Sequence, residues 1–260
     1  MPKKETHVRR IAILGGLLLL LVGTACNLSE PITASEKPDP VIEVVRRDVT
    51  PTVPTATLLA SPTSQFTPTP SATPFDEPSG CLRPPDDYTR VQIGSATINA
   101  RTLWMLERAQ QLYGGTVPFT GAGLTQGSYN PGVVSASFGT HDGGGAVDLT
   151  VRNLPYSWDI KWEDIPAMVD ALRLAGFAAF YRDEREDLTP HIHAIAIGDA
   201  ELSPAAQLQL TGRYGYFRGF DGFPRDDGIP LTPRHGDLVI CQWMLDMGYR
   251  DMRGEPLPLE

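Results

Sequence analysis

Apolar residues recur at helical spacing in the segment NARTLWMLERAQQLYG, which runs from Asn99 to Gly114. Asn99 can cap the start of a helix and Gly114 can end it, so the pattern predicts a helix between them. The same spacing predicts a second helix from about Glu163 to Ala175, which Gly176 would stop. Both predicted helices have one apolar side and therefore need a partner to cover it.

Alternating and β-branched stretches predict strands between and after these helices. The segment GAVDLTV at 145–151 predicts one strand, and the segments FAAFYR at 177–182 and HIHAIAIG at 191–198 predict a hairpin joined by a polar turn. We also expect a short strand at 117–120, a helix that begins at Ser203 with Pro204 in its first turn, and a closing helix at 237–248. Since helices and strands mix without a regular alternation, the expected class is α+β, with a small mainly antiparallel sheet and flanking helices.

This pattern begins only at Cys81, because the first third of the chain has a different composition. Residues 27–80 are rich in Pro, Thr and Ser and predict a disordered stalk, which leaves 81–260 as the folded domain. Residues 1–26 resemble an export signal, with a basic start, an apolar run from Ile11 to Gly23 and two small residues. That run is too short to cross a bilayer comfortably.

Cys26 follows the small residue Ala25 directly, which resembles the lipobox of bacterial lipoproteins. In those proteins, cleavage of the signal leaves an acylated N-terminal cysteine. Gly23 departs from the Leu or Val that is usual three places earlier, so an ordinary secretory signal or an uncleaved anchor is the alternative. Each version predicts export, and the lipobox version predicts a lipid anchor that holds the protein at the membrane, facing the cell wall.

Charge and cysteine content restrict the possible partners. The formal net charge is −9, and without the first 26 residues 18 basic groups face 30 acidic groups, which disfavours a nucleic-acid partner. If Cys26 carries lipid, Cys81 and Cys241 remain, one at each end of the folded part. Disulfides persist outside the cytoplasm, so we expect these two cysteines to pair, with two buried thiols as the alternative.

Three of the five histidines fall in two short motifs. In THDGGGAVD, glycines separate His141 from Asp148 and allow the chain to bend back, so that an imidazole and a carboxylate can meet. In PHIHAIAIG, His191 and His193 lie on the same face of a predicted strand. If the two strands are neighbours, His141, Asp148 and His193 can converge.

Three nitrogen and oxygen ligands with a fourth position left to water are typical of a catalytic zinc site, whereas structural zinc sites usually contain cysteine. The sequence therefore predicts that His141, Asp148 and His193 bind Zn²⁺. Each motif alone is weak, because a lone histidine is more often a packed or hydrogen-bonded residue and glycines near an aspartate more often form a turn.

The pattern of His141, Gly144, Ala146 and Asp148, followed by a strand with a final histidine, resembles the zinc D-Ala-D-Ala carboxypeptidases and murein endopeptidases. Their superfamily includes the lysostaphin-type endopeptidases and the Hedgehog signalling domain. The resemblance covers roughly residues 99–198. It implies a Hedgehog/DD-peptidase-like fold, His141, Asp148 and His193 as metal ligands, and hydrolysis of peptide bonds in peptidoglycan.

Three positions depart from the family. Tyr129 stands where members carry an arginine that helps to stabilise the substrate, and Gly139 stands where a serine is frequent, with Ser137 further back. Pro190 replaces the acidic general base of many carboxypeptidase members. His191 is then the best candidate for the catalytic group, as in the lysostaphin-type branch, with a role in orienting a ligand or in structure as the alternative. The acids Glu184, Glu186 and Asp187 rank lower, because acids in a turn are usually solvated.

Other polar and aromatic residues near the motifs are candidates for substrate contacts. Gln126, Ser128 and Ser137 are the candidate substrate-binding residues, although Gly-rich loops often carry such side chains without a function. Trp158 and Trp162 can form a platform for a sugar or peptide, or pack in the core. We read His235 as a surface or capping residue.

The leading hypothesis is therefore an exported zinc metallopeptidase that acts on stem peptides or cross-links of peptidoglycan. The second is a zinc-containing cell-wall-binding domain without turnover, since the superfamily includes such members. The third is a surface domain in which these histidines only pack or bind metal adventitiously.

Overall fold

The computed structural model describes residues 75–132, 135–154 and 158–258. The predicted signal at 1–26, the lipidation site Cys26 and residues 27–74 of the predicted stalk lie outside the described residues. Residues 75–80, the end of the predicted stalk, contact the domain: the Glu77 carboxylate accepts a hydrogen bond from the Gln242 backbone at 2.8 Å, and the Gly80 carbonyl accepts one from Arg108 at 3.3 Å. Among the described residues, no helix has the length and apolar character that crossing a bilayer requires.

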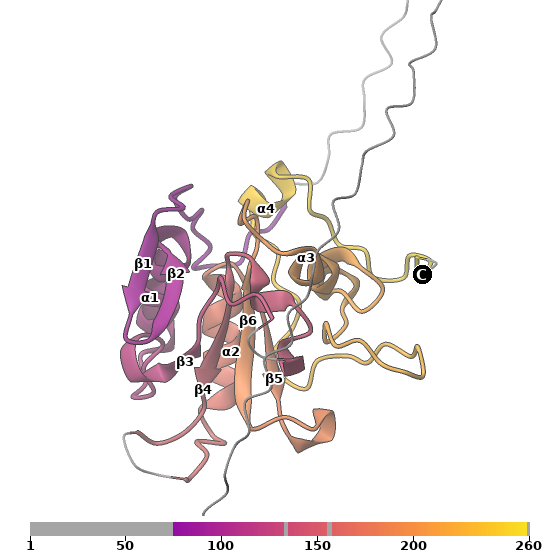
Figure 1. Ribbon diagram of the computed structural model, residues 1–260. Coiled ribbons are helices and arrows are strands. Elements are labelled where there is room, and N and C mark those ends of the chain that lie inside the picture. The colour runs from indigo at the N-terminus through magenta and orange to yellow at the C-terminus, as the bar shows by residue number, and fades with distance from the viewer. Residues whose placement is uncertain (1–74, 133–134, 155–157, 259–260) are drawn as a thin grey trace, which may run out of the picture. The chain divides into compact units, whose positions relative to one another are not determined.

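A four-stranded sheet forms the centre of the domain (Figure 1). Its strand order is β3 (Leu124–Gln126), β4 (Ala146–Thr150), β6 (His191–Ala196) and β5 (Phe177–Arg182). Every neighbouring pair is antiparallel. The predicted strand at 145–151 and the predicted hairpin are thus confirmed, and the α+β class with a small antiparallel sheet is confirmed with them.

One face of the sheet is covered by two helices, α1 (Ala100–Tyr113) and α2 (Ile165–Leu174). The Asn99 side chain caps α1 by accepting a hydrogen bond from the Thr102 backbone, and Gly114 ends it in the left-handed region at φ 63°. The strands contribute alternate apolar side chains to this core, among them Val147, Leu149 and Ile192. Both predicted helices are therefore confirmed to within about two residues at each end.

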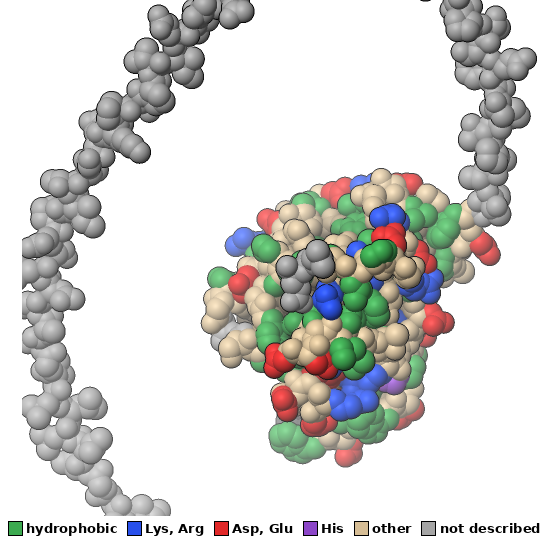
Figure 2. All heavy atoms as spheres, turned by 90° about the vertical axis from the view of Figure 1, so that its right-hand side faces the viewer, with side chains coloured by type: hydrophobic (Ala, Val, Ile, Leu, Met, Phe, Trp, Pro, Cys, Tyr) green, Lys and Arg blue, Asp and Glu red, His purple; other side chains and the backbone are tan. Residues whose placement is uncertain are grey.

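The second face of the sheet is covered only in part. Helix α3 (Pro204–Thr211), the short helix α4 (Gln242–Asp246) and the segment around Phe217 pack against Ala146, Phe180 and Ile195. In the view of Figure 2, turned toward this C-terminal side, Lys and Arg side chains are interspersed with Asp, Glu and hydrophobic ones. The remainder of this face, near Asp148 and His191, stays open to a cavity.

A disulfide joins Cys81 to Cys241, with the Cα atoms 5.7 Å apart and a sequence separation of 160. The predicted pairing is confirmed. The bond fixes the start of the described domain to the residue that precedes α4.

Three local predictions differ from the structure. Residues 117–120 form no strand, because Pro118 has no N–H to donate and the Phe119 N–H is bonded to the Gln110 side chain at 2.8 Å. The edge strand next to β4 is instead the short β3, inside the Gly-rich segment GAGLTQGSYNPG at 121–132. The closing helix is shorter than predicted, because Cys241 is extended at φ −94° and ψ 154° and only Gln242–Asp246 is helical.

An additional hairpin escaped the sequence analysis. Strands β1 (Arg90–Ile93) and β2 (Ala96–Asn99) pair with each other and lie beside α1 (Figure 1). The two-residue turn between them contains Gly94 at φ 59°, and a glycine between alternating residues is the signal that could have found it.

Candidate metal centre

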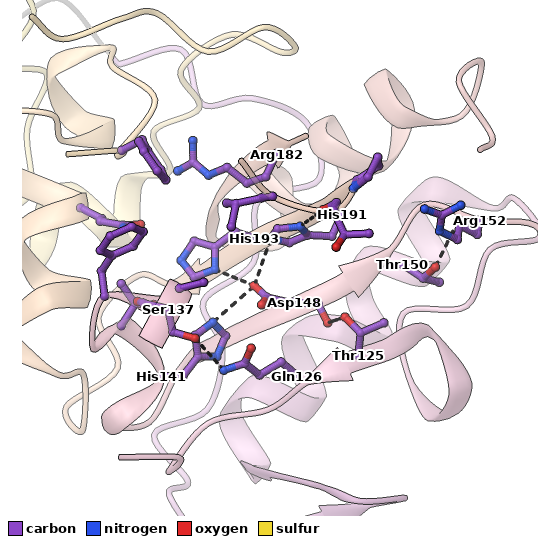
Figure 3. Close-up of a pocket in the computed structure, with 18 residues that line it drawn as sticks. Thr125, Gln126, Ser137, His141, Asp148, Thr150, Arg152, Arg182, His191 and His193 are labelled. Atoms are coloured by element: carbon purple, nitrogen blue, oxygen red, sulfur yellow. Dashed lines mark hydrogen bonds and ion pairs between the residues drawn. The ribbon is translucent and has the colours of Figure 1, made fainter. Parts of the chain in front are cut away.

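His141, Asp148 and His193 converge at one point on the open face of the sheet (Figure 3). The Asp148 Oδ1 atom lies 2.7 Å from His193 Nδ1 and 3.3 Å from His141 Nε2. The ring centroids of the two histidines are 5.1 Å apart. The ligand-type atoms of all three residues lie within 4.8 Å of one another, so the group can hold a metal ion.

Strand pairing places two of these residues together. Asp148 of β4 is directly opposite His193 of β6, and Thr150 is directly opposite His191. Residues opposite each other in a ladder share a face of the sheet, and so do residues two apart on one strand. Asp148, His191 and His193 therefore all face the cavity, because β4 and β6 pair in this register.

His141 comes from the glycine-containing loop before β4. It lies in a 3₁₀ turn over Thr140–Asp142, and the carbonyl of the preceding Thr140 accepts a hydrogen bond from the Ser203 hydroxyl at 3.1 Å. A Cβ on Gly144 would lie 2.8 Å from the Tyr129 hydroxyl and 3.0 Å from the Glu201 side chain, and Gly145 takes φ 75°. The glycines of the motif are therefore required by close approach and by a left-handed turn, as the sequence predicted.

Hydrogen bonding orients the His141 ring. Its Nδ1 lies 2.8 Å from the Gly127 carbonyl, and a carbonyl can only accept, so Nδ1 carries the hydrogen. The lone pair of neutral His141 is then on Nε2, which faces Asp148. An outer hydrogen bond of this kind is typical of histidines that bind metals, because it fixes the tautomer and the ring orientation.

The three side chains are strongly coupled electrostatically. Burial alone would raise the pKa of Asp148, but hydrogen bonds from His141 and His193 outweigh it and hold that pKa well below its usual range. Burial lowers the pKa of His193 to about 4, although Asp148 acts against it. For His141, burial is also the largest single influence, but the contacts with Asp148 together raise its pKa. A metal ion needs the carboxylate ionised and both imidazoles neutral, so it would have to displace the proton that Asp148 favours on His141 Nε2.

The ligand atoms sit in a sheltered position at the base of a cavity of about 420 Å³. The side chain of His141 is 1% exposed, that of His193 is 8% exposed and that of Asp148 is 15% exposed. The outer nitrogen of His193, Nε2, is buried and has no hydrogen-bond partner among the described residues. The donor set of two imidazoles and one carboxylate, with an open side toward the cavity, fits a metal with a free coordination position.

His191 lies at the edge of this group. Its Nδ1 is 2.5 Å from the Thr189 carbonyl, which places the hydrogen on Nδ1 and the lone pair on Nε2. Nε2 is 3.8 Å from Asp148 Oδ1, and the side chain is 18% exposed. His191 thus faces the cavity beside His141, Asp148 and His193.

No protein-family model, curated protein or solved structure matches this chain. Function must therefore be argued from the geometry and chemistry of the site itself.

The structure separates the three candidate substrate-binding residues. Gln126 and Ser137 line the cavity and are hydrogen-bonded to each other at 2.9 Å. Ser128 does not line it: the residue is completely buried, and its hydroxyl donates to the Ala146 carbonyl at 2.8 Å. The expected contact of Ser128 with a ligand is corrected to a structural role, since the hydroxyl satisfies a backbone group at the start of β4.

The less favoured candidates lie away from the ligands. Glu184, Glu186 and Asp187 do not line the cavity, and Glu186 is bonded to Arg234 at 2.9 Å. Tyr129 does not line the cavity. Its hydroxyl donates a hydrogen bond to Glu201 and accepts one from Asn99. The two tryptophans that could have formed a ligand platform or packed in the core are not core residues, because Trp158 is 86% exposed and Trp162 is 57% exposed. His235 is partly buried and its ring packs against Tyr181 at 5.6 Å.

Two arginines in the cavity wall were missed by the sequence analysis. Arg152 and Arg182 line the cavity (Figure 3). Gln209 and Phe223, from later in the chain, also line it. Arg182 is opposite His191 in the β5–β6 ladder. The predicted hairpin already implied this pairing, so the register of its two strands is the signal that could have found Arg182.

Proposed function

We propose that this protein is a zinc-dependent metallopeptidase that hydrolyses peptide bonds of bacterial peptidoglycan. The single observation that carries the proposal is the convergence of His141, Asp148 and His193 at the base of a cavity, with His191 beside them. Two imidazoles, one carboxylate and an open side match the catalytic class of zinc site rather than the cysteine-closed structural class. The motif resemblance to the zinc D-Ala-D-Ala carboxypeptidases and murein endopeptidases, with a Hedgehog/DD-peptidase-like fold, supports the same reading.

The chemistry follows from which atoms face the cavity. His141 Nε2, Asp148 Oδ1 and His193 Nδ1 would hold a zinc ion, which would supply Lewis acidity for the polarisation of a peptide carbonyl and the activation of water near neutral pH. His191 Nε2 takes a proton from the attacking water as the new C–O bond forms. It then gives that proton to the amine nitrogen as the C–N bond breaks. The Thr189 carbonyl keeps the other ring nitrogen protonated throughout.

The export signal and the stalk predicted from the sequence support a polymeric substrate outside the cytoplasm. The signal-like N-terminus, the lipobox-like Cys26 and the Pro-rich segment after it belong to an exported protein held at the membrane by lipid. Extended Pro-rich chain reaches about 3 Å per residue, so such a stalk can carry the domain toward the cell wall.

A zinc-containing cell-wall-binding domain without turnover is the second candidate. It is favoured by the lining of the cavity, where Asp148 is the single carboxylate among the described lining residues and already acts as a ligand. The peptidase then has no carboxylate to act as general base, and depends on His191 for proton transfer.

Digestion of purified peptidoglycan by the zinc-loaded chain tests the proposal. We expect one tightly held zinc ion per chain and the release of new amino groups, with muropeptide masses that identify the bond cut. His141→Ala is expected to abolish both, whereas His235→Ala, which removes a histidine packed against Tyr181 outside the cavity, is expected to retain both.

The other outcomes assign the competing functions. A zinc-loaded protein that releases no amino groups from any cell-wall substrate is the binding domain. A wild-type chain that holds less than about half an equivalent of zinc after purification without chelator is neither a zinc peptidase nor a zinc-containing binding domain.

A further inference from the structure

Trp158 is the most exposed large apolar side chain of the described residues, at 86%. Single apolar side chains are common on protein surfaces, so exposure alone indicates no function. Trp158 differs because the structure holds its backbone in place. The Asn153 N–H donates to the Asp159 carbonyl at 3.1 Å, and Arg152 pairs with Ile160 in an antiparallel bridge. The backbone that follows Trp158 is therefore tied to the continuation of β4.

The side chain of Arg152 also holds Trp158. Its Nη1 donates to the Trp158 carbonyl at 2.6 Å, and its guanidinium carbon lies 5.8 Å from the centroid of the indole ring. A cation over an aromatic ring is attracted to the face of that ring. Among the described residues, the guanidinium has no second hydrogen-bond acceptor and no carboxylate partner. Its other N–H groups and the exposed indole are therefore both available to a ligand.

Arg152 connects Trp158 to the metal group along one strand. Asp148, Thr150 and Arg152 alternate along β4 and its continuation, and all three line the cavity (Figure 3). Four residues of a strand advance about 13 Å, which is the distance along the strand from Asp148 to Arg152. This row of three side chains therefore runs from the candidate metal ligands to Trp158.

Peptidoglycan has a similar spacing between its peptide and its sugar. A stem peptide is joined at its N-terminus to a sugar of the glycan strand. About four extended residues, at roughly 3.3–3.6 Å each, therefore separate that sugar by about 13 Å from a bond near the C-terminal end of the stem. A stem that follows the row, with this bond at the metal group, reaches Trp158 with its sugar.

The chemistry of Trp158 and Arg152 fits a pyranose ring. The axial C–H groups of the sugar form an apolar face that packs against an aromatic ring, and its hydroxyl groups accept hydrogen bonds from a guanidinium. A lipid bilayer also accommodates tryptophan and arginine side chains at its surface. The formal net charge of −9 disfavours an anionic bilayer, whereas the binding of a neutral sugar does not depend on that charge.

We propose that Trp158 and Arg152 form a subsite for a sugar ring of the glycan strand, so that the cavity takes stem peptides that are still attached to the polymer. The choice of a glycan rests on the proposed function. Trp158 supplies the stacking surface, while Arg152 fixes the indole and donates to the sugar hydroxyls. The subsite itself needs no metal ion, because neither residue belongs to the candidate ligand group.

Binding of an oligosaccharide that carries no peptide tests the subsite apart from hydrolysis. The probe is the tetramer of N-acetylglucosamine, titrated by calorimetry into the full chain after chelator has removed any metal. We expect saturable binding, and Trp158→Ala should weaken it by about 5- to 10-fold through loss of the stacking surface. Trp158→Phe should restore most of the affinity, since phenylalanine keeps an aromatic face. Trp162→Ala is the matched control and should bind as the wild type does, because the exposed Trp162 ring packs on Tyr181 at 6.1 Å and has no contact with Arg152.

Two substrates that share one stem peptide test the connection with the metal group. One is the free stem peptide, and the other carries the same peptide on a disaccharide of the glycan strand. We expect the zinc-loaded full chain to cleave the glycan-linked peptide with a KM about 5- to 10-fold lower than that of the free peptide. Trp158→Ala should raise this KM to the value for the free peptide, and cleavage of the free peptide should stay unchanged.

The outcomes keep the sugar subsite apart from the peptidase function. Tetramer binding that depends on Trp158, without cleavage of either substrate, supports the subsite and rejects the peptidase. Equal binding of the tetramer by the wild type and Trp158→Ala, or an equal loss in Trp162→Ala, rejects the subsite. Absence of tetramer binding also rejects it, and vesicles of phosphatidylcholine and phosphatidylglycerol that bind Trp158→Ala more weakly than the wild type then assign Trp158 to the membrane surface instead.

Discussion

The two faces of strand β4 carry opposite kinds of side chain. Val147 and Leu149 are completely buried against α1 and α2, in a core made of apolar groups. Asp148, between them in sequence, faces the cavity and contacts two imidazoles. Strand β6 repeats the contrast, since Ile192 is buried in the core while His191 and His193 face the cavity.

The difference shows how a small sheet can hold charged groups in a fixed geometry. The apolar face fixes the strands by close packing, which leaves the polar face free to be chosen for chemistry. Substitutions on the core face should therefore change the free energy of unfolding. Substitutions on the cavity face should change metal binding and activity while the fold persists.

The largest effect is expected for Asp148→Asn on the cavity face. The amide keeps the shape of the side chain but supplies no negative charge to a metal ion. Loss of even an outer partner typically lowers metal affinity about 10- to 100-fold, so loss of this ligand should cost at least that much and reduce hydrolysis to background. Elemental analysis measures the zinc content, and digestion of purified peptidoglycan measures the hydrolysis. Full zinc occupancy in Asp148→Asn would contradict the assigned ligand set.

Leu149→Ala, at the adjacent position on the core face, should give the next largest effect. Deletion of a completely buried leucine side chain should destabilise the domain by about 2–5 kcal/mol, because it removes apolar burial and leaves a cavity. Chemical denaturation measures this loss, and the molecules that remain folded should bind zinc normally. A Leu149→Ala protein that is as stable as wild type but unable to bind zinc would reverse the proposed division between the two faces.

Ser203→Ala should give the smallest effect and sharpen the comparison at its boundary. The Ser203 hydroxyl caps α3 by accepting from the Ala206 backbone and also donates to the Thr140 carbonyl, next to His141. Loss of an N-cap costs about 1 kcal/mol. We expect this loss of stability in unfolding experiments, together with a small decrease in zinc affinity. Thr211→Ala, at the other end of α3, is the control. The Thr211 hydroxyl bonds only within the helix, at 3.4 Å, so its loss should leave zinc affinity unchanged.

Short-range patterns predicted much of this structure. Helix α1 has its cap residues in the sequence, and the β5–β6 hairpin follows from two apolar stretches around one polar turn. The convergence of His141, Asp148 and His193 was predictable because the first two are seven residues apart in a glycine-containing motif and the third lies in a strand of the hairpin.

Other features depend on contacts between distant residues, which the local sequence does not record. Strand β3 has three residues and exists because it pairs with β4, so the pattern of its own segment cannot reveal it. Ser128 is a polar residue in a Gly-rich loop like its neighbours, and only the approach of Ala146 explains its burial. Arg182 joins the cavity through its register with His191, which requires the strands to be aligned before the residue can be interpreted.

The disulfide between Cys81 and Cys241 encloses every residue assigned to the metal centre and to the cavity. A protease that cuts one surface loop inside this covalent ring leaves both fragments attached to each other. The nicked chain keeps its two halves at high effective concentration, so the ligands from the loop and from β6 can still meet. Closure of the ring therefore gives the domain a tolerance to clipping that noncovalent packing alone does not provide.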